Sequence, residues 1–204
     1  MLFSDSYLSI EKPAEGVFKD RGSKFIGFAY PISKEEEIKE IIRNLKKEHP
    51  GANHHCYAYR LGADKQNYRS NDDGEPAGSA GKPILGQIQS KDLTNILIVV
   101  VRYFGGTLLG VPGLINAYKN AAIEALNKAH IIETHIMFHY KVDFAFERMN
   151  DVMRILKENH CKIIHQNFLD TCTIEFSVKK INSEKLEQQL KNFFDITFVF
   201  LKSN

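Results

Sequence analysis

Residues 71–113 read NDDGEPAGSAGKPILGQIQSKDLTNILIVVVRYFGGTLLGVPG and organise the chain around one apolar strand. Residues 93–103 are a nearly continuous run of Leu, Ile and Val, the pattern of a strand that is covered on both faces. We therefore expect a central strand of a sheet with helices over it. A polar, glycine-rich loop precedes this strand, and a shorter glycine loop follows it.

The first loop runs from residue 71 to residue 83. Glycine allows a backbone to take positive φ or to come close to a ligand or another chain. A long segment with so little apolar content is costly to order unless something packs or binds there. The candidate binding residues in this loop are Asp72, Asp73, Glu75, Ser79 and Lys82.

The second loop lies at the carboxyl end of the central strand, where sites are commonly built in open α/β sheets. The strand delivers three large side chains directly into it. The alternative is structural, because glycines after a strand often mark only a sharp turn. The candidate binding residues here are Arg102, Tyr103, Phe104, Gly105 and Gly106.

Several motifs that carry known chemistry fail in this chain. The Gly81-Lys82 pair invites a phosphate-loop interpretation, but that pattern needs glycine at 76 and Ser or Thr at 83, and both positions are proline. The acidic residues of the first loop do not have EF-hand spacing. His54 and Cys56 share a strand face, yet two ligands do not make a metal site. We expect no metal, no cofactor and no catalytic residue.

Composition sets limits on the partners. The chain has 204 residues, with 27 Lys and Arg against 25 Asp and Glu. Because the charge is nearly balanced in both halves, any nucleic-acid binding must come from a local patch. The three cysteines are odd in number and widely separated, which predicts buried free thiols and a reducing compartment. No leader or membrane-spanning run is apparent, so we expect a cytoplasmic protein with no membrane partner.

The first half reads as strands at 7–10, 15–19 and 25–30, then a covering helix that ends at Glu48. Ser33 is its expected N-cap, with Glu36 completing a capping box. Strands at 53–61 and 67–70 form a hairpin, and a helix at 79–89 is interrupted near Pro83. A further helix after Pro112 points its free amides toward the glycine loop, a natural place for a phosphate, a carboxylate or an acidic partner.

The second half reads as β-α-β-β-α-β, the ferredoxin-like plan. Strands at 135–143, 161–168, 172–178 and 196–201 alternate with helices at 145–159 and 183–192, and residues 169–170 form a turn. The helix at 145–159 is expected to bury Phe146, Met149, Val152, Met153 and Leu156. His135 and His139 fall on one face of the first strand, where packing is the expected role. The domains predicted from this order are residues 1–130 and 131–204.

Three sequence blocks together resemble the signature of the YigZ/IMPACT family: NHHCYAYRLG, NDDGEPAGSAGKPIL and VVVRYFGGTLLG. The resemblance covers essentially the whole chain and implies an α+β protein with two domains. The first would be an α/β sandwich similar to the second domain of a small-subunit ribosomal protein. The ferredoxin-like βαββαβ domain would be similar to the last domain of elongation factor G.

The resemblance also implies a role in translation regulation, because eukaryotic IMPACT binds the scaffold that activates the amino-acid-starvation kinase. Our leading hypothesis is a non-enzymatic RNA- or ribosome-associated protein. Arg102, Lys82 and Lys24 would meet phosphates, while Tyr103 and Phe104 would stack on bases or pack on a partner.

Two alternatives stay open. One is a regulator that binds a protein partner at the two loops without nucleic acid. The other is an enzyme acting on a small anionic or phosphorylated substrate, in which a loop carboxylate serves as general base or metal ligand. The enzyme hypothesis lacks a nucleophile with an activating base, because neither Ser79 nor Thr107 has an evident histidine partner in the sequence.

Overall fold

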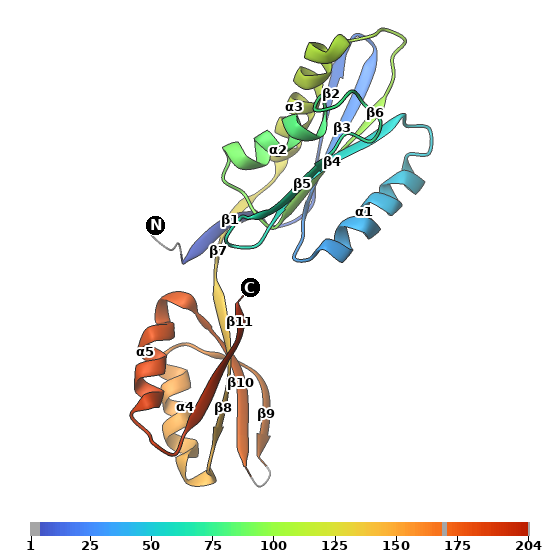
Figure 1. Ribbon diagram of the computed structural model, residues 1–204. Helices are drawn as coiled ribbons and strands as arrows, with labels where there is room; N and C mark the ends of the chain where they lie inside the picture. The colour runs from blue at the N-terminus through green and yellow to red at the C-terminus, as the bar shows by residue number, and fades with distance from the viewer. Residues whose placement is uncertain (1–4, 169–170, 204) are drawn as a thin grey trace. The chain divides into compact units, whose positions relative to one another are not determined.

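The structure is a computed structural model that describes residues 5–168 and 171–203. The described residues divide into two compact units (Figure 1). The N-terminal unit is Tyr7–Thr134, and the C-terminal unit consists of residues 135–203 together with residues 5 and 6. Each unit has its own hydrophobic core, as expected of a two-domain α+β chain.

The N-terminal unit is built on a five-stranded sheet in the order β2-β3-β6-β4-β5, in which every neighbouring pair is antiparallel. Its strands are β2 (Ala14–Asp20), β3 (Ser23–Pro31), β4 (His54–Leu61), β5 (Asn67–Asn71) and β6 (Ile96–Tyr103). A separate two-stranded sheet pairs β1 (Ser6–Ile10) with β7 (Ile131–His135). Because the larger sheet is antiparallel, the rule for open α/β sheets does not apply to the loop after β6.

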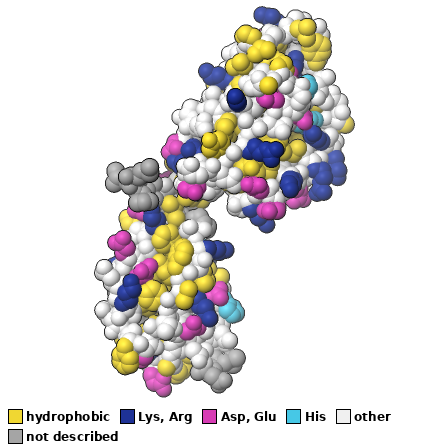
Figure 2. Space-filling model, viewed as in Figure 1, with side chains coloured by type: hydrophobic (Ala, Val, Ile, Leu, Met, Phe, Trp, Pro, Cys, Tyr) yellow, Lys and Arg dark blue, Asp and Glu magenta, His cyan; other side chains and the backbone are white. Residues whose placement is uncertain are grey.

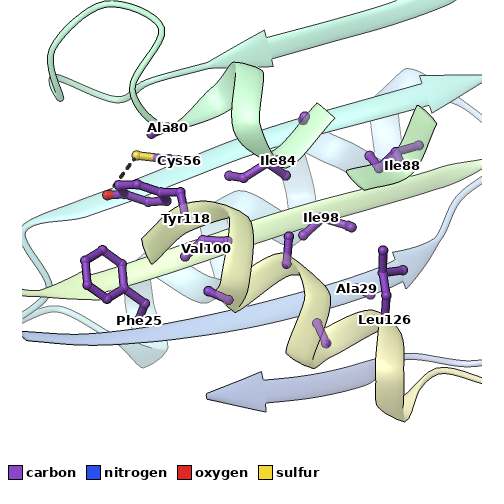
Figure 3. Packing of buried hydrophobic residues seen from close by; sticks show 14 of the residues in the cluster. Phe25, Ala29, Cys56, Ala80, Ile84, Ile88, Ile98, Val100, Tyr118 and Leu126 are labelled. Atoms are coloured by element: carbon purple, nitrogen blue, oxygen red, sulfur yellow. Dashed lines mark hydrogen bonds between the residues drawn. The ribbon is translucent and has the colours of Figure 1, made fainter. Parts of the chain in front are cut away.

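Strand β6 is central and covered on both faces, as the sequence predicts. Alternate side chains point to opposite faces of a strand. Ile96, Ile98 and Val100 pack in one cluster with α2 (Gly81–Ser90) and α3 (Gly110–Lys128), part of which Figure 3 shows. The alternate residues Leu97, Val99 and Val101 pack on the opposite face with α1 (Glu35–Glu48).

Two glycines bring α3 unusually close to the sheet. A Cβ at Gly16 would lie 2.3 Å from the Glu124 carbonyl carbon, and one at Gly27 would lie 2.3 Å from the Ala121 carbonyl oxygen. Only glycine leaves room for a helix backbone at that distance. The close approach fixes α3 across β2 and β3, and with it the loop that leads from β6 into α3.

The helix termini of this unit differ from the sequence predictions in two details. Ser33 is not the N-cap of α1: the N-cap is Lys34, which makes no side-chain cap hydrogen bond, and the Ser33 backbone N–H and hydroxyl donate to Glu37, at 3.2 and 2.7 Å, and not to Glu36. Helix α2 is not interrupted at Pro83. Proline stands in the first turn of this helix, where a missing N–H costs no intrahelical bond.

The C-terminal unit has the ferredoxin-like plan that the sequence predicts. Its sheet has the order β11-β8-β10-β9, with every neighbouring pair antiparallel, and α4 and α5 lie on one face of it (Figure 1). The elements are β8 (Met137–Phe144), a 3₁₀ turn (Phe146–Arg148), α4 (Met149–Glu158), β9 (Lys162–Phe168), β10 (Cys172–Lys179), α5 (Lys180–Lys191) and β11 (Thr197–Ser203). The turn predicted at residues 169–170 lies outside the described residues.

Several packing predictions for this unit are corrected. Phe146 and Met153 are exposed and Ile155 is buried instead, whereas Val152 and Leu156 are buried as predicted. Phe146 lies in the 3₁₀ turn before α4, outside the period of the helix. The predicted strand 135–143 is two strands, so that His135 lies in β7 and His139 in β8. The two histidines therefore belong to different sheets.

The structure also bears on the predictions made for the cysteines and for a membrane span. Cys56, Cys161 and Cys172 are all free thiols, as their spacing predicts, although Cys161 is only partly buried. Within residues 5–168 and 171–203, no helix is long and apolar enough to cross a membrane.

Candidate functional site

Asp72 organises the 71–83 loop by accepting hydrogen bonds from three backbone N–H groups. Its Oδ1 atom accepts from Ala80 and Gly81 at 3.0 and 2.8 Å, and its Oδ2 atom accepts from Gly78 at 2.9 Å. Helix α2 has no side-chain cap at its own N-cap residue, so the Asp72 carboxylate satisfies its first free amides. Burial opposes ionisation of Asp72, but these hydrogen bonds outweigh it and hold its pKa below the usual value.

Asp73 ties the same loop to the neighbouring strand and to α1. Its Oδ2 atom accepts from the backbone N–H of His55 at 2.7 Å, and its Oδ1 atom lies 3.3 Å from the Lys46 ammonium. Its carbonyl oxygen lies 2.8 Å from Nδ1 of His54. Asp73 also has a φ of 42°, a left-handed conformation that Asp tolerates better than most residues. The side-chain carboxylate and the backbone carbonyl of Asp73 therefore both hold the loop in place.

Glu75 lies at the centre of a buried polar cluster, which we define as Glu75, Arg102, Tyr118, Cys56 and His54. Its Oε1 atom accepts from the Arg102 guanidinium at 2.5 Å and from the Tyr118 hydroxyl at 2.7 Å. The Nε2 atom of His54 lies 3.9 Å away. The carboxylate is thus neutralised and hydrogen-bonded inside the protein, as a buried charge must be.

Arg102 is 6% exposed, and its guanidinium lies between two aromatic rings. The distance from its central carbon to the ring centre is 5.5 Å for Phe25 and 5.6 Å for Phe104. The Glu75 pair and these ring contacts engage the cation, while its buried Nε atom has no hydrogen-bond partner among the described residues. We expected Arg102 to meet a phosphate from the loop surface. In this structure its charge is directed into the polar cluster.

Cys56 and Tyr118 complete the cluster from the apolar side. The Cys56 thiol lies 3.0 Å from the Asp72 carbonyl oxygen and 3.3 Å from the Tyr118 hydroxyl, the contact drawn as a dashed line in Figure 3. Burial raises the pKa of the thiol and that of the phenol well above their usual values. Both groups therefore stay protonated at neutral pH, and Cys56 lacks the thiolate character that a nucleophile needs.

Ser79 and Lys82 have opposite environments. Ser79 is fully buried, and its hydroxyl donates to the Pro76 carbonyl oxygen at 2.6 Å. Lys82 is exposed in the first turn of α2, with its aliphatic stem beside Gly78. Of these two candidates, Lys82 presents its polar group to solvent.

The loop after β6 is anchored on both sides. The backbone N–H of Phe104 donates to the Asn53 side chain at 2.8 Å, and that of Gly105 donates to the Ser23 hydroxyl at 3.1 Å. A Cβ at Gly105 would lie 1.9 Å from the Gly22 carbonyl carbon, so this position requires glycine. Phe104 and Gly106 are exposed beside it, whereas Tyr103 is partly buried.

Tyr103 faces the α1 side of the sheet. Its hydroxyl lies 2.9 Å from Nδ1 of His49, the residue that follows α1. Of the residues placed at the second loop, Phe104, Gly105 and Gly106 therefore reach the surface, and Arg102 and Tyr103 are held by neighbours.

The three carboxylates of the first loop point to separate partners. Asp72 accepts hydrogen bonds from the α2 amides, Asp73 contacts β4 and α1, and Glu75 accepts hydrogen bonds within the buried cluster. No group of three or more His, Cys, Asp or Glu side chains within residues 5–168 and 171–203 has the geometry of a metal site. The arrangement therefore builds a rigid surface, and no free acid–base pair lies among these loop residues.

The sequence prediction found the loop residues but missed the groups that complete them. Asn53 and Ser23 fix the second loop, and Tyr118 and Cys56 close the cluster from apolar helix and strand positions. A buried Tyr usually needs a hydrogen-bond partner, so Tyr118 on an otherwise apolar helix face was the available signal. His54, which the sequence offered as an incomplete metal ligand, supports the loop through its contact with the Asp73 carbonyl oxygen.

Comparison of the sequence with known proteins identifies its family. Residues 21–126 match the model of the Impact N-terminal domain, and this match covers both loops and the polar cluster. The chain belongs to the IMPACT family. The IMPACT family member YvyE of Bacillus subtilis is 35% identical over 162 residues, which cover 76% of this chain and 75% of YvyE. The IMPACT family member YigZ of Escherichia coli is 34% identical over 166 residues, covering 80% and 81%.

A solved structure agrees with the two-domain fold. A crystal structure described as that of a hypothetical protein superposes with a TM-score of 0.77 at 28% identity, covering 98% of each chain. Yih1, described as a two-domain translational regulator, gives a TM-score of only 0.36 and covers 60% of this chain and 47% of its own.

Proposed function

We propose that this protein is a non-enzymatic RNA- or ribosome-associated protein that acts in translation or its regulation. The observation that carries the proposal is the exposed ring of Phe104 on a rigid loop. The ring is 44% exposed, its backbone is held by Asn53, and the Arg102 guanidinium lies 5.6 Å from its centre. An aromatic face fixed in advance stacks on a nucleobase without a large ordering cost.

The internal pairing of the loop carboxylates supports binding over catalysis. A general base or metal ligand must be free to meet a substrate, whereas Asp72 and Glu75 are both occupied by protein donors. Lys82 supplies an exposed positive charge in the first turn of α2. The translation part of the proposal is carried over from the family, in which Yih1 is described as a translational regulator.

The experiment is co-sedimentation of the whole chain with ribosomes and with free RNA at low and moderate salt. Phe104→Ala is compared with Tyr68→Ala, which removes another exposed aromatic ring in the same unit. We expect Phe104→Ala to weaken association about tenfold, because stacking of one base on an aromatic ring contributes about 1–3 kcal/mol. Equal binding by the two variants would remove Phe104 from the interface.

A protein partner is a second candidate, and the side chains beside Phe104 favour it. Leu108 is 82% exposed, and Val111 and Ile115 of α3 are also exposed. Figure 2 shows hydrophobic side chains gathered at this end of the N-terminal unit, over the start of α3. Contiguous apolar surface of this kind marks protein interfaces more often than nucleic-acid interfaces.

The two candidates predict different responses to nuclease. A ribosome-associated partner bound through RNA is released by nuclease treatment, whereas a protein partner stays bound. Leu108→Asp tests the second candidate directly, since a charge in an apolar interface is costly. Binding that survives nuclease and is lost in Leu108→Asp would replace the RNA proposal with the protein one.

A further inference from the structure

A groove of about 610 Å³ lies between α1 and the β4–β5 hairpin, on the face of the sheet that α1 covers. Four cations of α1 line it against a single carboxylate, that of Asp73. The lining cations are Lys39, Arg43, Lys46 and Lys47. They recur at helical spacing, which brings them to one side of α1. Figure 2 shows Lys and Arg side chains gathered over this part of the unit.

Most of this charge is not neutralised by the protein. Lys46 pairs with Asp73 at 3.3 Å, and Arg43 lies 4.0 Å from Glu40 with both side chains about two-thirds exposed. Such an exposed pair contributes little. Lys39 and Lys47 have no ion-pair partner among residues 5–168 and 171–203. The groove therefore presents a local positive field on a chain whose total charge is close to zero.

His55 lies in the floor of the groove with an unmet hydrogen bond. It is 6% exposed, and its Nε2 atom has no partner within the described part of the chain. Burial, and then the charge of Lys46, lower the pKa of His55, so the ring is neutral near pH 7. A neutral imidazole has one donor and one acceptor nitrogen, and the Nε2 atom that has no partner is itself buried.

Tyr57 and Asn71 stand beside His55 on the same face of the hairpin. They are directly opposite each other in the β4–β5 register, and both are partly exposed. An aromatic ring stacks on bases of any sequence, and an amide bonds to base edges. The groove thus combines cations, a stacking ring and polar groups.

We propose that this groove binds a single-stranded nucleic acid through its sugar–phosphate backbone and unstacked bases. The inference rests on the proposed RNA association, and it places the phosphate contacts on α1 because Arg102 is occupied. From Lys39 to Lys47 the helix advances roughly 12 Å, which spans more than one phosphate of a single strand. The exposed cations thus meet neighbouring phosphates, while Tyr57 stacks on a base.

An acidic peptide is the competing ligand, because it also satisfies the cations. A peptide of Asp and Glu has no flat ring to place on Tyr57, although its backbone N–H groups can donate hydrogen bonds as a nucleic acid can. The aromatic side chain in the groove therefore favours the nucleic acid. The two ligands predict different effects of changes at Tyr57.

The experiment measures binding of a fluorescent 12-nucleotide oligouridylate by anisotropy across a salt series. Arg43→Ala/Lys47→Ala is compared with Lys119→Ala/Lys128→Ala, which removes the same charge from the exposed face of α3. We expect the α1 variant to bind on the order of tenfold more weakly and its salt slope to fall by about 1.4, with the α3 variant unchanged. Equal losses in both variants, or none in either, would overturn the inference.

Two further arms separate the ligands. Tyr57→Leu keeps an apolar side chain in the groove without the ring, and we expect it to weaken binding on the order of tenfold, with Tyr57→Phe close to wild type. No change in Tyr57→Leu, together with equal competition by polyglutamate, would assign the groove to acidic peptides instead. Binding of an oligothymidylate of the same length then shows whether the groove binds RNA or DNA with higher affinity.

The experiments distinguish a failure of the proposed function from a failure of the groove proposal. Wild-type protein that sediments with ribosomes but binds no free oligonucleotide at low salt would overturn the groove and leave ribosome association standing. Loss of oligonucleotide binding in the α1 variant with an unchanged melting temperature supports the groove, since these side chains are exposed and the fold does not need them.

Discussion

The buried polar cluster around Glu75 and the groove along α1 use polar side chains in opposite ways. In the cluster, the carboxylate, the guanidinium and the phenol are bonded to one another. In the groove, lysines lie exposed and His55 keeps an unpaired nitrogen. The sequence draws attention to the first region because polar residues and glycines are concentrated in the 71–83 loop. Partnering inside the fold, and not polarity in the sequence, separates a structural cluster from a surface that is free to bind.

The largest expected effect is the loss of the Arg102 charge. Arg102→Met leaves Glu75 buried without its cation, and we expect the free energy of unfolding to fall by about 3–5 kcal/mol. Lys24→Met is the control, because Lys24 is exposed on β3 in register with the next residue, Tyr103, and should change stability by about 0.5 kcal/mol at most. Guanidinium chloride unfolding measures both. A loss below about 1 kcal/mol in Arg102→Met would mean that the cluster does not hold the two loops.

A second effect separates two adjacent glycines of the loop after β6. Gly105→Ala places a Cβ against the Gly22 backbone, and we expect it to cost about 3 kcal/mol. Gly106→Ala meets open space, so only its φ of 86° is strained, at about 1 kcal/mol. Thermal unfolding of both variants gives the comparison. Equal losses would show that the loop relaxes away from the β2–β3 turn.

Asp72→Asn is expected to cost about 1–2 kcal/mol, because the amide loses the charge that strengthens the bonds from the α2 amides. The folded-state pKa of Asp72 is lowered from 3.8. Its contribution is therefore fully present above about pH 4 and is lost as the pH falls through the folded-state pKa. Urea unfolding from pH 7 to pH 2.5 should show the variant and wild type converging at acid pH. Asp20→Asn, half-buried at the end of β2, is the control. A constant difference across this range would contradict the assignment.

The smallest effect on stability is expected in the groove. Arg43→Ala/Lys47→Ala should change the free energy of unfolding by no more than about 0.5 kcal/mol, because both side chains are exposed and only Arg43 has an ion-pair contact among the described residues, a weak one with Glu40. The same urea titration measures it. A loss above about 1 kcal/mol would mean that the groove charges, like those of the polar cluster, stabilise the fold.

The fold was predictable where the residue pattern is local and regular. The apolar run of β6, the helix after Pro112 and the βαββαβ order all follow from periodicity, and the structure confirms them. Several errors lie at element ends, whereas the predicted strand 135–143 is divided into β7 and β8. The N-cap at Lys34 in place of Ser33 and the 3₁₀ turn at Phe146 depend on how the chain enters each helix, which a period does not encode.

The sequence indicated the two loops but not the contacts that hold them, and the binding role of the loop residues stays a prediction. Glu75 and Tyr118 are 43 residues apart, and Cys56 and Tyr118 are 62 apart, so neither contact has a signal in local sequence. The sequence prediction treated α1 as an ordinary covering helix. Its cations at 39, 43, 46 and 47 carry the helical spacing of one face, and that periodicity was the available signal for the groove.

The pairing of β1 with β7 has a consequence for the order in which the chain folds during synthesis. The Glu11 backbone N–H donates to the His130 carbonyl oxygen at 3.0 Å, across 119 residues. At roughly 5–20 residues per second, the ribosome needs about 6–24 seconds to add the partner of β1 after β1 itself. Strand β1 must therefore wait for β7, and the edge of β1 that pairs with β7 stays unpaired until translation reaches residue 135.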